Sequence, residues 1–120
     1  MFSSNWIKGD TKMVEERTIL WTGLSGKEYK YWIYPIGTSF EEKPGNYIFA
    51  KETNPHTWSP CYIGQTENLN QRLDNHEKEA DAKRNGATHA HLTPDVETVR
   101  KTEEKDLIQK WKTPCNVQLI

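Results

Sequence analysis

The sequence has few cysteines, no long apolar run and no export signal, and each absence excludes a class of protein. Two cysteines, Cys61 and Cys115, are too few for a disulfide-stabilised scaffold. No apolar stretch approaches the roughly 20 residues that a membrane-spanning helix needs, and the N-terminus lacks the apolar segment of a signal peptide. We therefore expect a cytoplasmic protein with free thiols and no membrane association.

An excess of charge of one sign is also absent. Sixteen basic and 17 acidic residues give a formal net charge of −1, which excludes a protein that coats nucleic acid through a strongly positive overall field but allows a local basic face. Leucine, isoleucine, valine and phenylalanine together make up only 22 of 120 residues, while five tryptophans and five tyrosines add bulk for a core. Length and composition predict one folded, aromatic-rich α+β domain.

Runs of β-branched and aromatic residues, bounded by turn residues, indicate the strands. They are residues 18–36, expected to form a hairpin with a turn at 23–26, and residues 46–52, 61–64 and 88–92. Residues 54–60 contain two prolines and are expected to form a long loop before the strand at 61–64. In that strand, Cys61 and Tyr62 should point to opposite faces of the sheet.

Two helices are expected in the second half of the chain. The first begins at about residue 68, where Asn68 and Gln71 have the form of a capping box, and it runs to about residue 82. The second begins after Thr93 or Asp95 and must end by Pro114, since proline interrupts a helix.

The first expected helix carries ionisable residues within its apolar stripe. Arg72 and His76 share a face with Leu69 and Leu73, at spacings of three, four and seven residues. Taken alone, Arg72 could extend its charged head past the leucines or pair with Glu104, and His76 could be a half-buried histidine with satisfied hydrogen bonds.

The second expected helix has a carboxylate in the same kind of place. Glu104 precedes Leu107, Ile108 and Trp111 by three, four and seven residues, whereas Glu103 is expected further round the helix, toward solvent. Ionisable groups on buried faces are costly without partners. Such groups together indicate a functional cluster or a structural ion network.

Two tripeptides extend this pattern into the strands. The residues that carry it are Gly45-Asn46-Tyr47, Tyr62-Ile63-Gly64, Thr66, Leu69, Arg72, His76, Glu104, Leu107-Ile108 and Pro114-Cys115-Asn116. In this order and spacing, residues 45–120 resemble the GIY-YIG nuclease family. The chain has Asn46 where the family has isoleucine, and the 14 residues between Tyr47 and Tyr62 predict an enlarged hairpin loop.

The resemblance implies a fold class and a division of the chain. The fold is α+β, with a small mixed or antiparallel three-stranded sheet flanked by helices, and with an added N-terminal β-hairpin. Residues 45–120 would form the nuclease domain. Residues 1–44 would form an N-terminal extension whose hairpin packs on that core.

The resemblance also implies a metal-dependent endonuclease that hydrolyses phosphodiester bonds in DNA. Glu104 would be the sole protein ligand of Mg²⁺ or Mn²⁺, which suits an ion that keeps several waters. Arg72 would bind the phosphate in the transition state. Tyr47 or His76 would deprotonate the attacking water, and Tyr62 would orient water or phosphate.

The identity of the base stays open at this point, because a free tyrosine has a pKa near 10 and is a poor base at neutral pH. His76 would either accept the proton of Tyr47 or hold its hydroxyl. Thr66 and Asn116 would support the site, with Asn116 contacting the phosphate or a residue that does.

Other functions remain as alternatives. The first is a catalytically weak member of the family that binds nucleic acid or a protein partner, although the full set of site residues argues against loss of activity. The second is a different metal-dependent enzyme centred on His89 and His91, which share one face of a strand. A structural role for these histidines is favoured, because no third or fourth ligand is evident.

The near-neutral net charge favours a narrow DNA target or a protein partner that supplies specificity. A local basic surface could still follow the phosphate backbone. Its candidate residues are Lys78, Lys83, Arg84, Lys101, Lys105 and Lys112. The alternative is that they form ordinary solvated helix faces.

Overall fold

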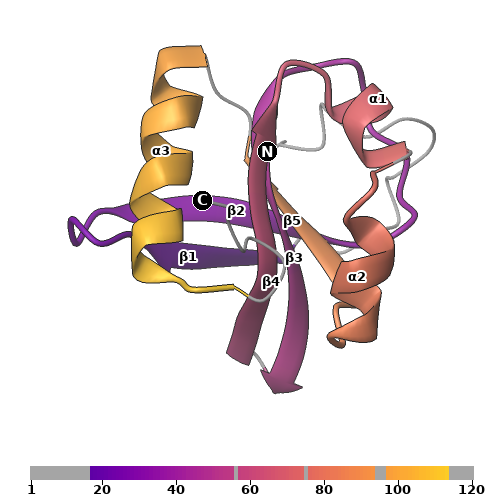
Figure 1. Ribbon diagram of the computed structural model, residues 1–120, viewed down its shortest axis with the longest axis horizontal. Coiled ribbons are helices and arrows are strands. Elements are labelled where there is room, and N and C mark those ends of the chain that lie inside the picture. The colour runs from indigo at the N-terminus through magenta and orange to yellow at the C-terminus, as the bar shows by residue number, and fades with distance from the viewer. Residues whose placement is uncertain (1–16, 56, 75, 94–96, 114–120) are drawn as a thin grey trace.

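Five strands form one antiparallel sheet in the order β1-β2-β5-β3-β4, and three helices flank it (Figure 1). The computed structural model describes residues 17–55, 57–74, 76–93 and 97–113. The elements are β1 (Thr18–Thr22), β2 (Glu28–Pro35), β3 (Gly45–Asn54), β4 (Thr57–Thr66), α1 (Leu69–Asp74), α2 (Glu79–Arg84), β5 (His89–Thr93) and α3 (Glu97–Lys110). The expected α+β fold is confirmed, with the three strands β3, β4 and β5 extended by an N-terminal hairpin.

The hairpin of β1 and β2 continues the sheet. β2 pairs with β5, with Trp32 opposite Leu92 and Pro35 opposite His89. Gly26 lies in the hairpin turn with a φ of 90°, a conformation that glycine adopts without strain. The hairpin expected at residues 18–36 is therefore confirmed, and it supplies two of the five strands.

Alternating side chains of β3 divide the core between the two faces of the sheet. Tyr47 and Phe49 belong to one hydrophobic cluster, with Leu69, Leu73 and Ala82 of α2. Ile48 and Ala50 belong to the other, which includes Leu107 of α3. The strand period of two causes this division, and Figure 1 shows α1 and α2 on one side of β3 and β4 and α3 on the other.

The prediction of a long loop at residues 54–60 is wrong, and so is the prediction of an enlarged hairpin loop. The extra residues lengthen both strands to ten residues, and Asn54 pairs with Thr57 across a short connection. Pro60 is accommodated because β4 is an edge strand, and because the pairing shifts register between Phe49 and Ala50.

This irregularity in the pairing also changes the direction of two side chains. Phe49 pairs with Tyr62, while Ala50 pairs with Pro60, so Cys61 has no residue opposite it. Cys61 and Tyr62 both pack against the cluster under α1 and α2. The expectation that they face opposite ways is therefore wrong, and Cys61 is a buried core residue.

The single helix expected at residues 68–82 is two short helices, α1 and α2. Asn68 accepts a hydrogen bond from the Gln71 backbone N–H at 3.0 Å, so the expected cap is present. The helix α1 ends at Asp74, a residue type that favours helix ends and turns over helix interiors. His76 lies between the helices, and its carbonyl accepts a hydrogen bond from Glu79.

Side chains of the N-terminal hairpin bind one flank of α3. Tyr31 donates a hydrogen bond of 2.6 Å to Glu103, and Tyr29 donates one of 2.7 Å to Asp106. Glu103 is only 3% exposed, so the expectation that it points to solvent is wrong. The spacing of apolar residues along the helix could not predict this burial, because the partner of Glu103 is a tyrosine from the distant N-terminal hairpin.

The helix α3 ends at Lys110, short of the expected limit at Pro114. Trp111, just beyond it, donates a hydrogen bond to the Thr22 carbonyl and so attaches this end of the helix to β1. None of the described helices is long and apolar enough to cross a membrane.

Candidate active site

Tyr47 lies at the centre of the candidate site, where β3 and β4 bring it against Gly64. The two residues are paired across the strands, and a Cβ atom at Gly64 would lie 2.6 Å from the Tyr47 hydroxyl oxygen. Any larger residue at this position would displace the tyrosine. The glycine of the second tripeptide therefore makes room for the tyrosine of the first.

Two nitrogen atoms converge on the Tyr47 hydroxyl. Its oxygen lies 2.7 Å from His76 Nε2, and Arg72 Nε donates a hydrogen bond to it over 3.3 Å. The ring of Tyr62 lies beside them, with its centroid 6.1 Å from that of Tyr47 and 5.1 Å from that of His76. Four of the five predicted catalytic residues thus lie together, although the helix expected to join Arg72 and His76 is broken.

The hydrogen bonds of His76 determine which ring nitrogen carries its proton. Nδ1 accepts a hydrogen bond from the Lys78 backbone N–H at 2.8 Å, so this nitrogen is unprotonated. Burial lowers the pKa of His76 to about 4, so the ring is neutral near pH 7 and its proton is on Nε2. His76 therefore donates its hydrogen bond to the Tyr47 oxygen.

Opposing effects act on the pKa of Tyr47. Burial raises this pKa most, and the charges of Tyr62 and Glu104 raise it further, whereas Arg72 lowers it through its charge and its hydrogen bond. On balance the pKa lies above its ordinary value. The oxygen accepts hydrogen bonds from both nitrogen neighbours, and both bonds strengthen when the tyrosine loses its proton. Arg72 and His76 therefore offset part of the cost of forming a buried tyrosinate.

The remaining donors of Arg72 bind a carboxylate. Nη1 and Nη2 contact the two carboxylate oxygens of Glu77 at 2.7 and 3.0 Å. These hydrogen bonds lower the pKa of Glu77 to about 2. Arg72 thus pairs with Glu77. The ion pair of Arg72 with Glu104, one possibility that the sequence left open, is not the one that forms.

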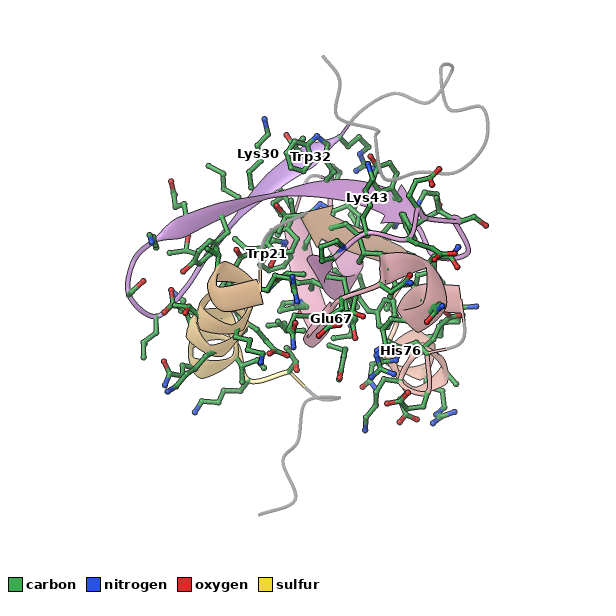
Figure 2. All side chains as sticks on the ribbon, turned by 90° about the horizontal axis from the view of Figure 1, so that it is seen from above. Trp21, Lys30, Trp32, Lys43, Glu67 and His76 are labelled. Carbon is green, nitrogen blue, oxygen red and sulfur yellow. The ribbon has the colours of Figure 1, made fainter. Side chains whose placement is uncertain are left out.

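An open pocket of about 450 Å³ adjoins Arg72 at the start of α1. Thr66, Glu67, Asn68, Gln71 and Arg72 line it. Thr66 accepts a hydrogen bond from the Asn68 backbone N–H at 3.1 Å and so shapes the approach to the helix. Figure 2 shows Glu67 between α3 and the α1–α2 region, with His76 within that region.

Glu104 approaches the site from α3. It is partly buried, and burial raises its pKa. Its charge raises the pKa of both Tyr47 and Tyr62, so the carboxylate acts on the same group of residues. Within the described segments, no hydrogen bond or ion pair is recorded for the Glu104 side chain.

The Glu104 carboxylate is suited to bind a hard divalent cation. A partly buried carboxylate without a positive partner is unfavourable, and a bound cation would compensate it. A single carboxylate fits Mg²⁺ or Mn²⁺, since hard cations of this kind keep several waters and often take one or two carboxylates. The predicted supporting residue Asn116 lies outside the described residues.

The model of the GIY-YIG catalytic domain matches residues 43–114. The chain belongs to the GIY-YIG family. This is a nuclease family, and membership implies nuclease-type activity on nucleic acid. The comparisons with curated proteins and with solved structures found no match.

His89 and His91 lie apart from the GIY-YIG site, on the sheet face under α3. Both rings contact Trp58, with centroid distances of 5.0 and 4.6 Å. Trp21 donates a hydrogen bond to His91 Nδ1, and burial lowers the pKa of His91 to about 3. These aromatic contacts support the structural role that the sequence favoured for the two histidines.

The basic residues considered as one phosphate-binding surface lie on separate helices. Lys101 and Lys105 are exposed on α3, and Lys112 is exposed just after it. Lys83 and Arg84 are exposed on α2, where they pair with acidic residues of the same helix. The six candidate residues therefore do not form one continuous helix face.

Two contacts that shape this site could not be predicted from the sequence. One is the ion pair of Glu77 with Arg72, and the other is the Lys78 backbone N–H that binds His76. An acidic residue in a polar segment and a backbone amide leave no signal in one sequence. Both contacts depend on the break between α1 and α2, which the helical pattern did not predict.

Proposed function

We propose that this protein is an endonuclease that hydrolyses phosphodiester bonds in DNA with the help of one divalent metal ion. The observation that carries the proposal is the Tyr47 hydroxyl, which accepts hydrogen bonds from Arg72 and His76. The partly buried Glu104 carboxylate beside it and the nuclease activity of the family add support.

Tyr47 is the general base in this mechanism. After losing its own proton to solvent, its oxygen takes a proton from the attacking water. The hydroxide then forms a bond to phosphorus, and the bond to the 3′ oxygen of the DNA breaks. His76 orients Tyr47 and stabilises the tyrosinate, because its proton already lies on the nitrogen that faces the tyrosine.

Arg72 and Tyr62 act on the phosphate. The guanidinium has two terminal donors suited to two phosphate oxygens, and it gains most when negative charge builds up in the transition state. Tyr62 is partly buried beside it, and its hydroxyl would hold water or phosphate.

Glu104 would hold the Mg²⁺ or Mn²⁺ ion. When bound, the ion stabilises the charge of the phosphate and of the leaving 3′ oxygen. Glu104 itself supplies the negative charge that attracts the ion, and α3 sets its position relative to the tyrosines.

We assign the activity to residues 45–120 and a supporting role to residues 1–44. The support for this division is the hydrogen bonding of the hairpin with Glu103 and Asp106, on either side of Glu104 in the sequence. The hairpin would thereby fix the rotation of α3. A net charge of −1 provides little general attraction to DNA. Specific recognition of a restricted set of DNA targets, or a protein partner, would supply the affinity.

A cleavage screen tests the proposal. Purified protein is incubated with plasmid, single-stranded DNA, branched DNA and RNA, each with Mg²⁺, Mn²⁺ or EDTA. We expect cleavage of at least one DNA substrate with metal and none with EDTA. Glu104→Gln is the matched inactive variant and excludes a contaminating nuclease.

Two results would overturn the proposal. Cleavage that persists in Glu104→Gln or in EDTA would contradict the metal-dependent mechanism. Metal-dependent binding of DNA without cleavage of any substrate would favour the binding module instead.

A further inference from the structure

Each of the three nitrogens of the Arg72 guanidinium donates a hydrogen bond within the protein. The terminal nitrogens bind the two carboxylate oxygens of Glu77 at 2.7 and 3.0 Å, and Nε binds the Tyr47 hydroxyl. A carboxylate and a phosphate accept this pair of parallel hydrogen bonds in the same geometry. Glu77 thus occupies the position in which Arg72 would bind a phosphate.

The position of Glu77 allows it to leave. Its side chain is 64% exposed, and it lies in the connection between α1 and α2, directly after His76. Ion pairs at exposed positions contribute little to stability, so breaking this one costs little. Movement of Glu77 leaves the bond between Arg72 and Tyr47 in place, because that bond uses a different nitrogen.

We infer that Glu77 is an internal competitor of the substrate phosphate, occupying Arg72 in the free protein and giving way when a phosphate of DNA binds. The inference rests on the proposed function, because it requires Arg72 to be a phosphate ligand. Glu77 is held on the same chain, so it competes at a high effective concentration. Free phosphate has to overcome this competition with a single contact, whereas DNA brings further phosphate contacts. The site therefore favours polymeric DNA over small phosphate compounds.

DNA binding without metal tests the competition separately from catalysis. Anisotropy of a labelled duplex is measured in EDTA at fixed salt for the wild type, Glu77→Ala and the control Glu79→Ala. Glu79 lies two residues away and pairs with Lys83 instead of Arg72. We expect Glu77→Ala to bind DNA about two- to fivefold more tightly, in line with the strength of an exposed ion pair, and Glu79→Ala to change affinity by less than about twofold.

A second measurement follows Arg72 directly. In ¹⁵N-labelled protein, the Arg72 Nε–H signal is identified by its loss in Arg72→Lys, and inorganic phosphate is then added at constant ionic strength. We expect the signal to shift at lower phosphate concentration in Glu77→Ala than in the wild type or Glu79→Ala.

The outcomes separate the inference from the proposed function. If Glu77→Ala leaves both the DNA affinity and the response of the Arg72 signal to phosphate unchanged, the competition is absent, although Arg72 remains a phosphate ligand. If Glu77→Ala weakens DNA binding, Glu77 positions Arg72 and the inference is wrong. If no variant responds to DNA or phosphate, the role of Arg72 in the proposed function fails as well.

Discussion

Two tyrosines on opposite faces of one sheet make short hydrogen bonds, and their charged partners change the pKa of the hydroxyl in opposite directions. Tyr31 donates to the Glu103 carboxylate, whereas Tyr47 accepts from Arg72 and from the neutral His76. Both tyrosines are almost completely buried, and burial raises the pKa of each. Glu103 raises the pKa of Tyr31 further, while Arg72 offsets part of the rise for Tyr47, whose pKa still lies above its ordinary value. The charge and direction of the partner, more than burial, therefore distinguish a structural tyrosine from a candidate base.

The same contrast separates two neighbouring carboxylates on α3. Glu103 is buried and accepts the hydrogen bond of Tyr31. Glu104 faces the other side, where its charge acts on Tyr47 and Tyr62. Adjacent residues on a helix point about 100° apart, so one side chain can attach the helix while the next serves the site.

The largest expected effect comes from replacing each of these two carboxylates with the corresponding amide. Glu104→Gln should fold normally and lose metal-dependent cleavage by about a thousandfold or more, because metal ions contribute several kcal/mol to such reactions. Glu103→Gln should keep cleavage and lose about 1–2 kcal/mol of unfolding free energy, since a charged hydrogen bond becomes a neutral one. Cleavage rates and thermal unfolding of both variants check this. Loss of cleavage in Glu103→Gln with activity retained in Glu104→Gln would reverse our assignment.

Removing one hydroxyl from each tyrosine sharpens the main comparison. Tyr47→Phe should reduce the cleavage rate by about 10²- to 10⁴-fold, the usual contribution of a general base. It should also lose about 1–3 kcal/mol of unfolding free energy, because the buried His76 N–H loses its acceptor. Tyr31→Phe should keep activity and lose about 1–3 kcal/mol of unfolding free energy, because Glu103 would stay buried without its donor. Single-turnover rates and urea unfolding separate the two effects. Equal loss of activity in both variants would show that the tyrosines act alike.

The pH dependence of cleavage distinguishes the roles of His76 and Tyr47. The pKa of His76 is lowered to about 4, so wild-type activity should rise toward alkaline pH with no step near pH 6.5. His76→Ala should lower the rate by about 10- to 100-fold through loss of one hydrogen-bond donor, and should move the rise to higher pH. A step near pH 6.5 in the wild type that disappears in His76→Ala would instead identify His76 as the proton acceptor.

The smallest effect concerns one buried histidine on each face. Burial lowers the pKa of His76 to about 4 and of His91 to about 3, both below the unfolded value near 6.5. The unfolded chain therefore binds more protons below pH 6.5, and stability should fall as the pH decreases, by about 2 kcal/mol for each histidine between pH 7 and 5. Thermal unfolding between pH 7 and 5 should show a smaller slope in His76→Ala and in His91→Phe. An unchanged slope in both variants would contradict the lowered pKa values.

Much of the fold was predictable because its signals are local. The N-terminal hairpin follows from runs of strand-forming residues around a glycine-containing turn, and the start of α1 follows from the Asn68 cap. The strand length of β4 was not predictable in this way. Proline normally argues against a strand, and only the edge position of β4 and its irregular pairing accommodate Pro60.

The candidate site was predictable to a similar extent. The spacing of the two tripeptides, Arg72 and Glu104 led to the family, and Tyr47, Tyr62, Arg72 and His76 do lie together. Their catalytic roles stay predictions. The helical pattern that placed His76 one turn after Arg72 was wrong in detail, since a break between α1 and α2 separates them.

By itself, the sequence determined the family, the order of the elements and the residue types available at the site, because motifs and periodic patterns are read from neighbouring residues. Only the tertiary structure decided that Glu103 is buried against Tyr31, 72 residues away, and that Tyr47 accepts hydrogen bonds from Arg72 and His76, 25 and 29 residues away. The physical reason is that a side chain's protonation and exposure depend on which groups surround it. Those groups come from strands and helices that folding alone brings together.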